Sequence, residues 1–337
     1  MADTPQTLSL VTLAQEYRGD IVKQINRRVV LLKLLPIVRG AGQNVAWVAQ
    51  KSGHIAENHT DGQTASNFGS DGQVPATLSW GLYRANVHVT KLAMDAAASS
   101  GTPMGNRRLW AKNIVDGAGS LAALLEDDAF DGAGTGTLLA GLDVAIGDTT
   151  NTYATINRAT GGNEYWHPYV VDPGSLTAPT LALIRTDLGA IYDACGETPD
   201  IAVAPTAVFN KIAGLFDANR RWNIVNTARG AVRLDAGYEG IEVDGCMFVK
   251  SKDATANQIY YINSNYVRFE TLPDSELPLE VVDAIQADDG YGSLPFDLTV
   301  HALAENGPAK RAEVLSQIQL KVEKPNACGV RKNVATS

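Results

Sequence analysis

The chain has 337 residues, 45% of them hydrophobic, which is enough apolar material for one large domain or two modest ones. Acidic residues number 37 against 28 lysines and arginines, so the formal net charge is -9. A field of this sign repels a nucleic-acid backbone, which argues against tight, sequence-specific binding of DNA.

Cysteine usage and hydropathy indicate a reducing compartment and no membrane. Cys195, Cys246 and Cys328 are isolated, odd in number and without a CxxC spacing, which favours small buried residues over disulfides or a zinc site. No stretch approaches the roughly 20 apolar residues of a membrane helix, and the first residues do not form a signal peptide. We therefore expect a protein that is made and kept in a cytoplasm and has no membrane partner.

The first segment with helical periodicity covers residues 7–35 and ends before Pro36. Basic residues collect in this segment although the chain as a whole is acidic. Lys23, Arg27 and Arg28 are therefore candidates for contact with an acidic partner. A solvated helix face explains the same charges equally well.

Residues 39–90 form a long excursion between two stretches of strand character. Residues 45–50 and 77–91 are predicted strands, and the segment between them is rich in Gly, Ser, Asn and Asp. This pattern predicts a large hairpin, and compact domains rarely contain so long a loop unless it is functional or disordered. Trp47, Phe68 and Trp80 indicate that part of the hairpin packs on something. If the hairpin projects, these three residues are candidate contacts with another molecule.

The strongest helical pattern covers residues 103–130, with Pro103 in the first turn and one apolar face made by Trp110, Ile114, Ala118, Leu121 and Leu125. Such a helix is about 40 Å long at a rise of 1.5 Å per residue. Arg107 and Arg108 stand near its positive end and residues 126–128 are acidic near its negative end, which is unfavourable for the helix dipole. We therefore expect these charges to have partners elsewhere, and head-to-tail neighbours are one hypothesis.

Two glycine-punctuated segments follow this helix. Residues 131–142 lack the Gly-Lys-Ser/Thr of a phosphate-binding loop and follow a helix rather than a strand, so they are interpreted as a helix end and linker. Residues 141–170 are interpreted as a joint between two lobes. Trp166, in the run Tyr-Trp-His-Pro-Tyr, is the expected anchor of this joint.

The remainder of the chain alternates helices and strands. A helix over 180–195 with Thr180 as cap, a buried strand over 201–204 and a helix over 206–216 form an αβα unit. Three or four strands follow within 240–270, and two more are predicted at 298–304 and 314–322. The pattern is that of an α+β protein.

No residue pattern points to chemistry. The five histidines have no spacing that suggests a nucleophile and its base, and His54 and His59, with Glu57 and Asp61, fit no standard metal-ligand pattern. The hydrolase, zinc-protease and calcium-loop motifs are absent from the sequence. We therefore expect no catalytic, cofactor-binding or metal-binding residue, and not an enzyme.

Taken together, the order of these parts resembles the major capsid proteins of tailed bacteriophages, which have the Hong Kong 97-type fold. The strongest local likeness is carried by residues 141–160 and 165–172, GLDVAIGDTTNTYATINRAT and YWHPYVVD. Further likeness lies in residues 237–270, GYEGIEVDGCMFVKSKDATANQIYYINSNYVRFE, and in residues 317–333, QIQLKVEKPNACGVRKN. The likeness covers nearly the whole chain as a pattern of order and punctuation.

The resemblance implies an α+β, Hong Kong 97-like capsid fold in five segments. These are an N-terminal arm (1–38), an extended loop (39–91), a first part of a peripheral domain with its spine helix (92–178), an axial domain (179–266) and a second part of the peripheral domain (267–337). It also implies self-assembly into hexamers and pentamers of an icosahedral head shell, built in the host bacterial cytoplasm and found in the virion.

The resemblance further implies a portal and a decoration protein as partners, and packaged double-stranded DNA that is contacted only weakly. The sequence departs from the family in two places: no proline follows Gly245, and no long charged leader precedes the arm. We therefore expect either a separate scaffolding protein or a leader removed by processing. Two alternatives stay open: an encapsulin-like nanocompartment shell, and an α/β small-molecule enzyme built on the unit near Ile201.

Overall fold

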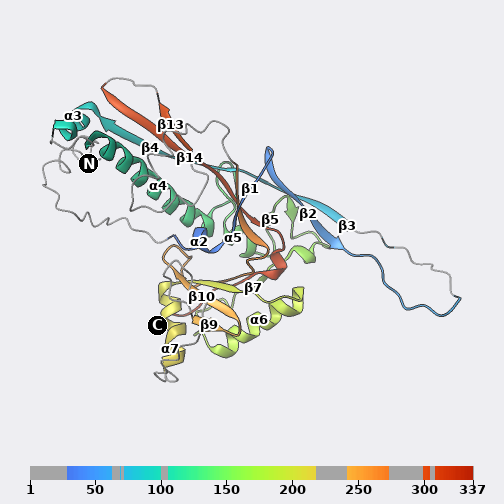
Figure 1. Cartoon of the computed structure of the whole chain (residues 1–337). Helices are drawn as coiled ribbons and strands as arrows, with labels where there is room; N and C mark the ends of the chain where they lie inside the picture. The colour runs from blue at the N-terminus through green and yellow to red at the C-terminus, as the bar shows by residue number, and fades with distance from the viewer. Residues whose placement is uncertain are drawn as a thin grey trace.

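The computed structural model describes residues 29–62, 69, 72–99, 105–217, 241–272, 299–303 and 308–336. In these ranges the chain forms an elongated body with a long helix, a second body at one end of it, and a projecting hairpin (Figure 1). Of the helix predicted over 7–35, residues 1–28 lie outside the described residues. The described end is the short helix α2 (Leu31–Leu34), which stops two residues before Pro36.

The first sheet contains the strands β1 (Ile37–Arg39), β4 (Gly81–Thr90), β12 (Val267–Thr271), β13 (Thr299–Leu303) and β14 (Ala309–Val322). Strand β14 is central. Strands β4, β12 and β13 all pair with it in antiparallel fashion, and β1 adds in parallel to β12. Strands from residues 37–39 and from residues 299–322, far apart in the sequence, thus lie in one sheet, which ties the elongated body together.

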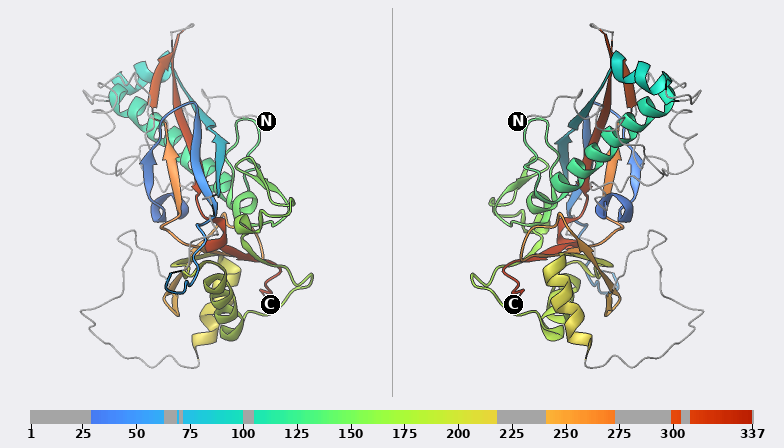
Figure 2. Two further views of the ribbon diagram at one scale, coloured as in Figure 1. Left: turned by 90° about the vertical axis from the view of Figure 1, so that its right-hand side faces the viewer. Right: turned by 90° about the vertical axis from the view of Figure 1, so that its left-hand side faces the viewer.

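Helix α4 (Gly105–Asp131) crosses one face of this sheet, next to the shorter helix α3 (Lys91–Ser99), as Figure 2 shows. Ile114, Ala118, Leu121 and Leu125 are each at most 2% exposed, so the predicted apolar face is confirmed. Burying a Leu or Ile side chain contributes about 1.5–3 kcal/mol, and this face holds helix and sheet together. Helix α5 (Leu142–Ile146) extends the same core.

The second sheet has six strands in the order β7 (Tyr169–Val171), β15 (Gly329–Arg331), β11 (Ile259–Ile262), β8 (Ile201–Pro205), β10 (Cys246–Ser251) and β9 (Ile241–Val243). Helices α6 (Leu181–Cys195) and α7 (Thr206–Asp217) pack on it around a separate apolar core. The predicted αβα unit is present, and the Thr180 hydroxyl caps α6 by accepting from the Leu183 amide at 3.2 Å. Strands β7 and β15 join this sheet from sequence positions outside 179–266.

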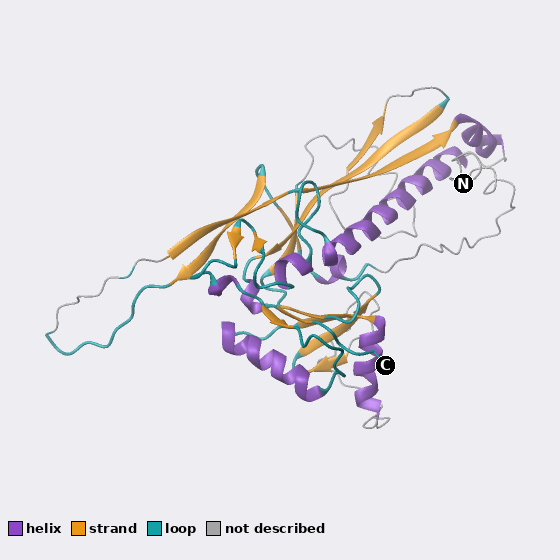
Figure 3. Ribbon diagram, turned by 180° about the vertical axis from the view of Figure 1, so that it is seen from behind, coloured by secondary structure: helices purple, strands orange, loops and turns teal. Residues whose placement is uncertain are grey.

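The projecting hairpin consists of β2 (Asn44–Ser52) and β3 (Gly72–Ser79), paired in antiparallel fashion. Figure 3 shows it leaving the elongated body at the end opposite helix α3. Residues 51–62 are all exposed. In the described part of the loop, His54 Nδ1 lies 3.0 Å from the Gly69 carbonyl oxygen.

The single strand predicted over 77–91 is wrong, because the chain leaves one sheet for another at Trp80. Strand β3 ends at Ser79 and pairs with β2, whereas β4 begins at Gly81 and pairs with β14. The buried positions change phase there: Leu78 and Trp80 are buried before the break, and Tyr83 and Val87 after it. A Cβ at Gly81 would lie 2.7 Å from the Ile318 carbonyl oxygen, so only glycine fits this crossing.

Short elements connect the two bodies. Strands β5 (Thr152–Tyr153) and β6 (Ile156–Asn157) form a tight hairpin, and the 3-10 turns η1 (Glu164–Trp166) and η2 (Pro325–Ala327) precede β7 and β15. The glycine-rich linker after α4 closes on itself through a bridge between Ala133 and Ala140.

No helix in the described residues is long and apolar enough to span a membrane.

Candidate assembly site at the hairpin root

The projecting hairpin is seated on the elongated body at a contact that we call the hairpin root: Trp47, Thr77, Tyr153, Trp166 and Lys321. The Trp47 ring lies with its centre 6.4 Å from the rings of both Tyr153 and Trp166, and those two rings are 6.2 Å apart. Tyr153 and Trp166 are at most 2% exposed. The hairpin therefore rests on a buried aromatic platform.

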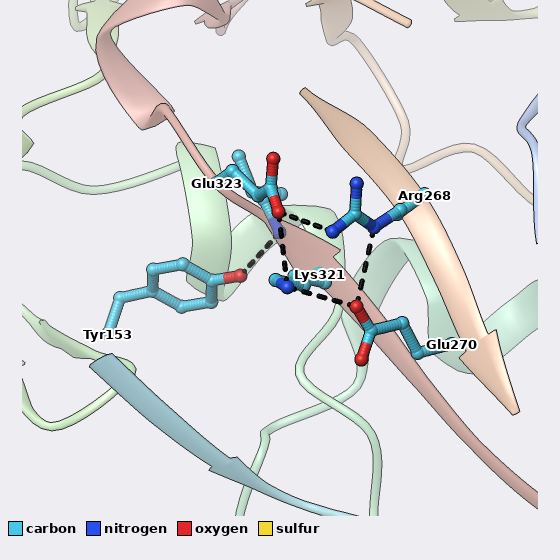
Figure 4. Close-up of polar contacts among 6 residues, drawn as sticks. Tyr153, Arg268, Glu270, Lys321 and Glu323 are labelled. Atoms are coloured by element: carbon cyan, nitrogen blue, oxygen red, sulfur yellow. Dashed lines mark hydrogen bonds and ion pairs between the residues drawn. The ribbon is translucent and has the colours of Figure 1, made fainter. Parts of the chain in front are cut away.

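Lys321 also contacts Trp47, with its Nζ 5.0 Å from the centre of the indole ring. The same ammonium forms ion pairs with Glu270 at 2.9 Å and with Glu323 at 3.1 Å, and Lys321 is only 4% exposed. Arg268 pairs with both glutamates, so the four charges form a neutral network (Figure 4). Because Lys321 is shielded from water, its ammonium group attracts the indole ring of Trp47 strongly. This attraction helps to hold the hairpin in place.

Tyr153 links this network to the platform. Its hydroxyl oxygen accepts a hydrogen bond from the Val322 amide at 2.9 Å, next to Lys321 (Figure 4). Burial raises the pKa of Tyr153 well above its ordinary value, so the phenol stays neutral. The aromatic platform is thereby fixed to the central strand β14.

The hairpin is also hydrogen-bonded to the turn between β5 and β6. The Thr77 amide donates to the Ala154 carbonyl oxygen at 3.1 Å. Ala154 and Thr155 both have positive φ, at 51° and 68°, which fits a two-residue turn but is unfavourable for a β-branched residue. Thr155 thus has a strained backbone in the turn to which the hairpin is hydrogen-bonded.

Arg158 holds the segment that supplies the platform. Its guanidinium is 1% exposed and donates to the carbonyl oxygens of Trp166, Val144, Ala145 and Asp148 at 2.5–3.2 Å, and to Asn151 Oδ1 at 2.8 Å. Burial lowers its pKa to about 10, so it remains charged at neutral pH. Trp166 Nε1 donates in turn to the Tyr153 carbonyl oxygen at 3.2 Å. Residues 144–166 are thus wrapped around one buried cation.

Two carboxylates join the elements around the second sheet. Asp143 of α5 accepts from the hydroxyl of Tyr260 in β11 at 2.6 Å, which links the two bodies. Asp187 of α6, fully buried, pairs with Arg331 of β15 and accepts from the hydroxyl of Tyr261 at 3.1 Å. The contacts of Asp187 fix helix α6 to strands β11 and β15 of the second sheet.

The candidate contact residues occupy different environments. Trp47 is half-buried at the hairpin root, and Trp80 is 8% exposed, with its Nε1 donating to the Gly42 carbonyl oxygen at 3.0 Å. Arg107 and Arg108 belong to the first turns of α4, but their side chains, like Lys23, Arg27, Arg28 and Phe68 as a whole, lie outside what the structure describes. Trp166 is 2% exposed and packs against Trp47 and Tyr153. A role of these residues in contacts between subunits stays a prediction.

Sequence reasoning expected a partner for Glu126 without identifying it, and it missed the buried charges Arg158 and Lys321. Arg158 and Lys321 lie within an otherwise ordinary turn and strand, and no spacing marks them. For Lys321 there was one signal: it lies between Leu320 and Val322 in a strand that is buried on both faces. In the described residues, no group of three or more His, Cys, Asp or Glu side chains is arranged to hold a metal ion.

Solved structures with the same architecture match the whole chain. A subunit from the capsid of cyanophage A-1(L) aligns with a TM-score of 0.73 and 17% identity, covering 96% of this chain and 97% of that one. The SrpI encapsulin of Synechococcus elongatus aligns with a TM-score of 0.60 and 14% identity, covering 98% and 96%. The capsid of the myophage XM1 aligns with a TM-score of 0.53 and 11% identity, covering 96% and 98%.

The chain has the Hong Kong 97-type capsid fold. The predicted α+β class and this fold are confirmed over nearly the full length of the chain. No protein-family model matches the sequence, and no curated protein matches it either.

Proposed function

We propose that the chain is a major capsid protein, which self-assembles into hexamers and pentamers of the icosahedral head shell that encloses phage double-stranded DNA. The observation that carries the proposal is the whole-length likeness to the cyanophage A-1(L) capsid subunit, at a TM-score of 0.73. A fold alone does not determine a function. The hairpin supplies support from this chain itself.

Residues 51–62 of the hairpin are exposed along their whole length in the isolated subunit. Ile55 is 52% exposed there, and Val48 in the strand that leads to it is 62% exposed. An extension of this length that buries so little on its own subunit is typical of a segment that a neighbouring molecule covers. A second copy of the chain is the neighbour that a shell provides.

Each of the five segments has its own proposed role in the shell. The arm (1–38) and the extended loop (39–91) reach neighbouring subunits, the peripheral segments (92–178 and 267–337) form the shell wall, and the axial segment (179–266) lies at the centre of each capsomer. Strands β7 and β15 connect the peripheral segments to the axial one, because β15 pairs with β11 and β7 pairs with β15. The proposed contacts between subunits are made by Lys23, Arg27, Arg28, Trp47, Phe68, Trp80, Arg107 and Arg108. Trp166 anchors the joint between the domains.

The proposed partners follow from this role. The chain associates with itself, with a portal, with a scaffolding protein and with a decoration protein, and the assembled shell is part of the virion. Packaged DNA is contacted only weakly, since the net charge of -9 repels phosphate. Assembly takes place in the cytoplasm of the host bacterium.

Electron microscopy of the purified protein tests the proposal. We expect closed, faceted shells built of hexamers and pentamers, obtained with or without a co-expressed scaffolding protein. A protein that stays monomeric under all conditions that support assembly of phage coat proteins would contradict it.

An encapsulin-like shell is the second candidate, and the alignment with the Synechococcus elongatus encapsulin at a TM-score of 0.60 favours it over the remaining classes. The alignment with the cyanophage capsid is closer, at 0.73. The contents of purified particles separate the two candidates. Particles from the native source that hold double-stranded DNA support the capsid, whereas particles that hold a cargo enzyme support the compartment.

A further inference from the structure

Helix α2 starts without a capping side chain of its own. It has four residues, and Val30 at its N-cap position makes no side-chain hydrogen bond. The amides of Val30, Leu31 and Leu32 lie at this start, and all three residues are at most 1% exposed. Buried backbone amides need acceptors, because an unpaired one costs about 1–3 kcal/mol.

The acceptor comes from the middle of the chain. The carboxylate of Glu126, on the spine helix α4, accepts from the Val30 amide at 2.9 Å and from the Leu31 amide at 2.8 Å through Oε1. Its Oε2 accepts from the Leu32 amide at 3.2 Å. One side chain thus caps a helix that lies more than 90 positions earlier in the sequence, and it holds residues 30–32 against α4.

Glu126 is 0% exposed. Burial raises the pKa of its carboxyl to about 7, the three backbone amides lower it, and the charge of Asp253 in the turn between β10 and β11 raises it further. On α4, the neighbouring Asp127 is exposed, and Asp128 is half-buried and accepts a hydrogen bond from the Tyr83 hydroxyl at 2.6 Å. Lys33 of α2 is exposed. The residues before Val29 lie outside the described part of the chain.

We propose that Glu126 is the positioning residue that fixes where the N-terminal arm leaves the subunit body, and that ionisation of its carboxyl weakens this attachment at and above neutral pH. The attachment is a property of the single subunit. Its consequence for assembly rests on the proposed function: residues 29–35 would be held against α4 in acid and would become free to meet neighbouring subunits as the pH rises.

The direction follows from proton linkage. When residues 29–35 leave α4, water reaches Glu126 and the pKa of its carboxyl returns toward its ordinary value of 4.5. The attached form therefore binds more protons than the detached form between pH 4.5 and about 7. The extra stability of the attached form is complete below this window and is lost as the pH rises through 7.

Hydrogen exchange of the full-length, unassembled protein tests this. The measured quantity is the protection of the amides in residues 30–32 relative to their intrinsic exchange at each pH, with the core of α6 as an internal reference. For the wild-type chain we expect this protection to fall about tenfold between pH 6 and pH 8, which is the change that a pKa shift from about 4.5 to about 7 produces. In Glu126→Gln, which cannot ionise, we expect a change below about twofold over the same range.

Two further variants control for simple loss of packing. Glu126→Asp keeps the charge and shortens the reach, so it is expected to lower the protection while retaining a pH response. Glu242→Gln removes a charge from an exposed position in β9 and is expected to behave as the wild type. A wild-type protection that is flat from pH 6 to pH 8, or a Glu126→Gln response equal to that of the wild type, would overturn the proposal.

The hydrogen-exchange experiment tests the role of Glu126, and the assembly experiment tests the capsid function, so either proposal can be rejected without the other. If the amides respond as expected but no shells form, the attachment stands and the capsid function is rejected. If shells form but the amides do not respond, the capsid function stands and the role of Glu126 is rejected.

Discussion

Arg158 illustrates how single buried charges organise this subunit. Its hydrogen bonds in the described structure go to four carbonyl oxygens and one amide oxygen rather than to a carboxylate. An arginine has five N–H donors in a fixed plane, so one side chain sets the path of a whole loop. Arg158 thereby places Trp166 and Tyr153, on which the hairpin rests.

We expect Arg158→Met to destabilise the subunit by about 3 kcal/mol, because the carbonyl groups around the lost guanidinium are left without donors. Urea unfolding of the unassembled protein measures this. Arg185→Met is the control, since the Arg185 side chain is 61% exposed in its ion pair with Asp244, and such a pair contributes about 1 kcal/mol at most. Equal losses in the two variants would contradict the assignment of Arg158 as the centre of the loop.

Lys321 and Glu270 are expected to depend on each other. Lys321→Met leaves a buried carboxylate short of a partner, and Glu270→Gln does the same to the ammonium, so each alone is expected to cost about 3 kcal/mol. The double variant should cost at least about 1 kcal/mol less than the sum of the two, as measured by chemical denaturation. Strict additivity would mean that the network under Trp47 does not act as a unit.

Residue-scale features were the least predictable from the sequence. The cap at Thr180 was predicted because a hydroxyl before an apolar helix is a local signal. A partner for Glu126 was expected from its place at the unfavourable end of the helix dipole. The identity of that partner was not predicted, because it is a set of backbone amides about 95 positions away, and backbone amides carry no sequence information. The role of Glu126 as a cap of α2 is evident only from the packing of α2 against α4.

At the scale of elements, helix α4 and the β2–β3 hairpin are the features that set the shape of the subunit. The helix was predicted well because its apolar residues repeat with the helical period over many turns. The division of residues 77–91 between two sheets was missed, although the buried positions shift from even to odd numbers at Gly81. Alternation identifies a strand, but it does not say which strand will pair with it.

Removal of the hairpin tip, residues 52–72, tests the role of the loop. The described part of the tip is exposed and contributes little to the cores, so we expect a folded subunit with nearly unchanged thermal stability. Closed-shell formation, followed by electron microscopy, should be impaired. Normal shells from the shortened chain would count heavily against a loop that contacts neighbouring subunits.

The charges at the start of α4 provide a second test at this scale. Arg107→Glu with Arg108→Glu also suits the dipole of the helix, so the variant is expected to fold at least as well as the wild type. If these arginines contact acidic groups of a neighbour, self-association measured by analytical ultracentrifugation should weaken at least tenfold. Lys252→Glu, in an exposed turn, is the control, and unchanged assembly of the double variant would refute the contact.

At the scale of the whole molecule, two bodies are joined at several points rather than by a flexible linker. Strands β7 and β15 enter the second sheet from both sides of the sequence, and Asp143 bridges from α5 to Tyr260. In the capsid shell that we propose, these joints would transmit load from one neighbour to the next. The net charge of -9 would keep packaged DNA from binding tightly to that shell.

The most direct test of the central claim is cryo-electron microscopy of particles assembled from the full-length protein. We predict a closed icosahedral shell in which the β2–β3 hairpin of each subunit lies over an adjacent copy and residues 51–62 become buried there. A closed shell in which these residues face solvent, or a protein that forms no shell, would contradict the account.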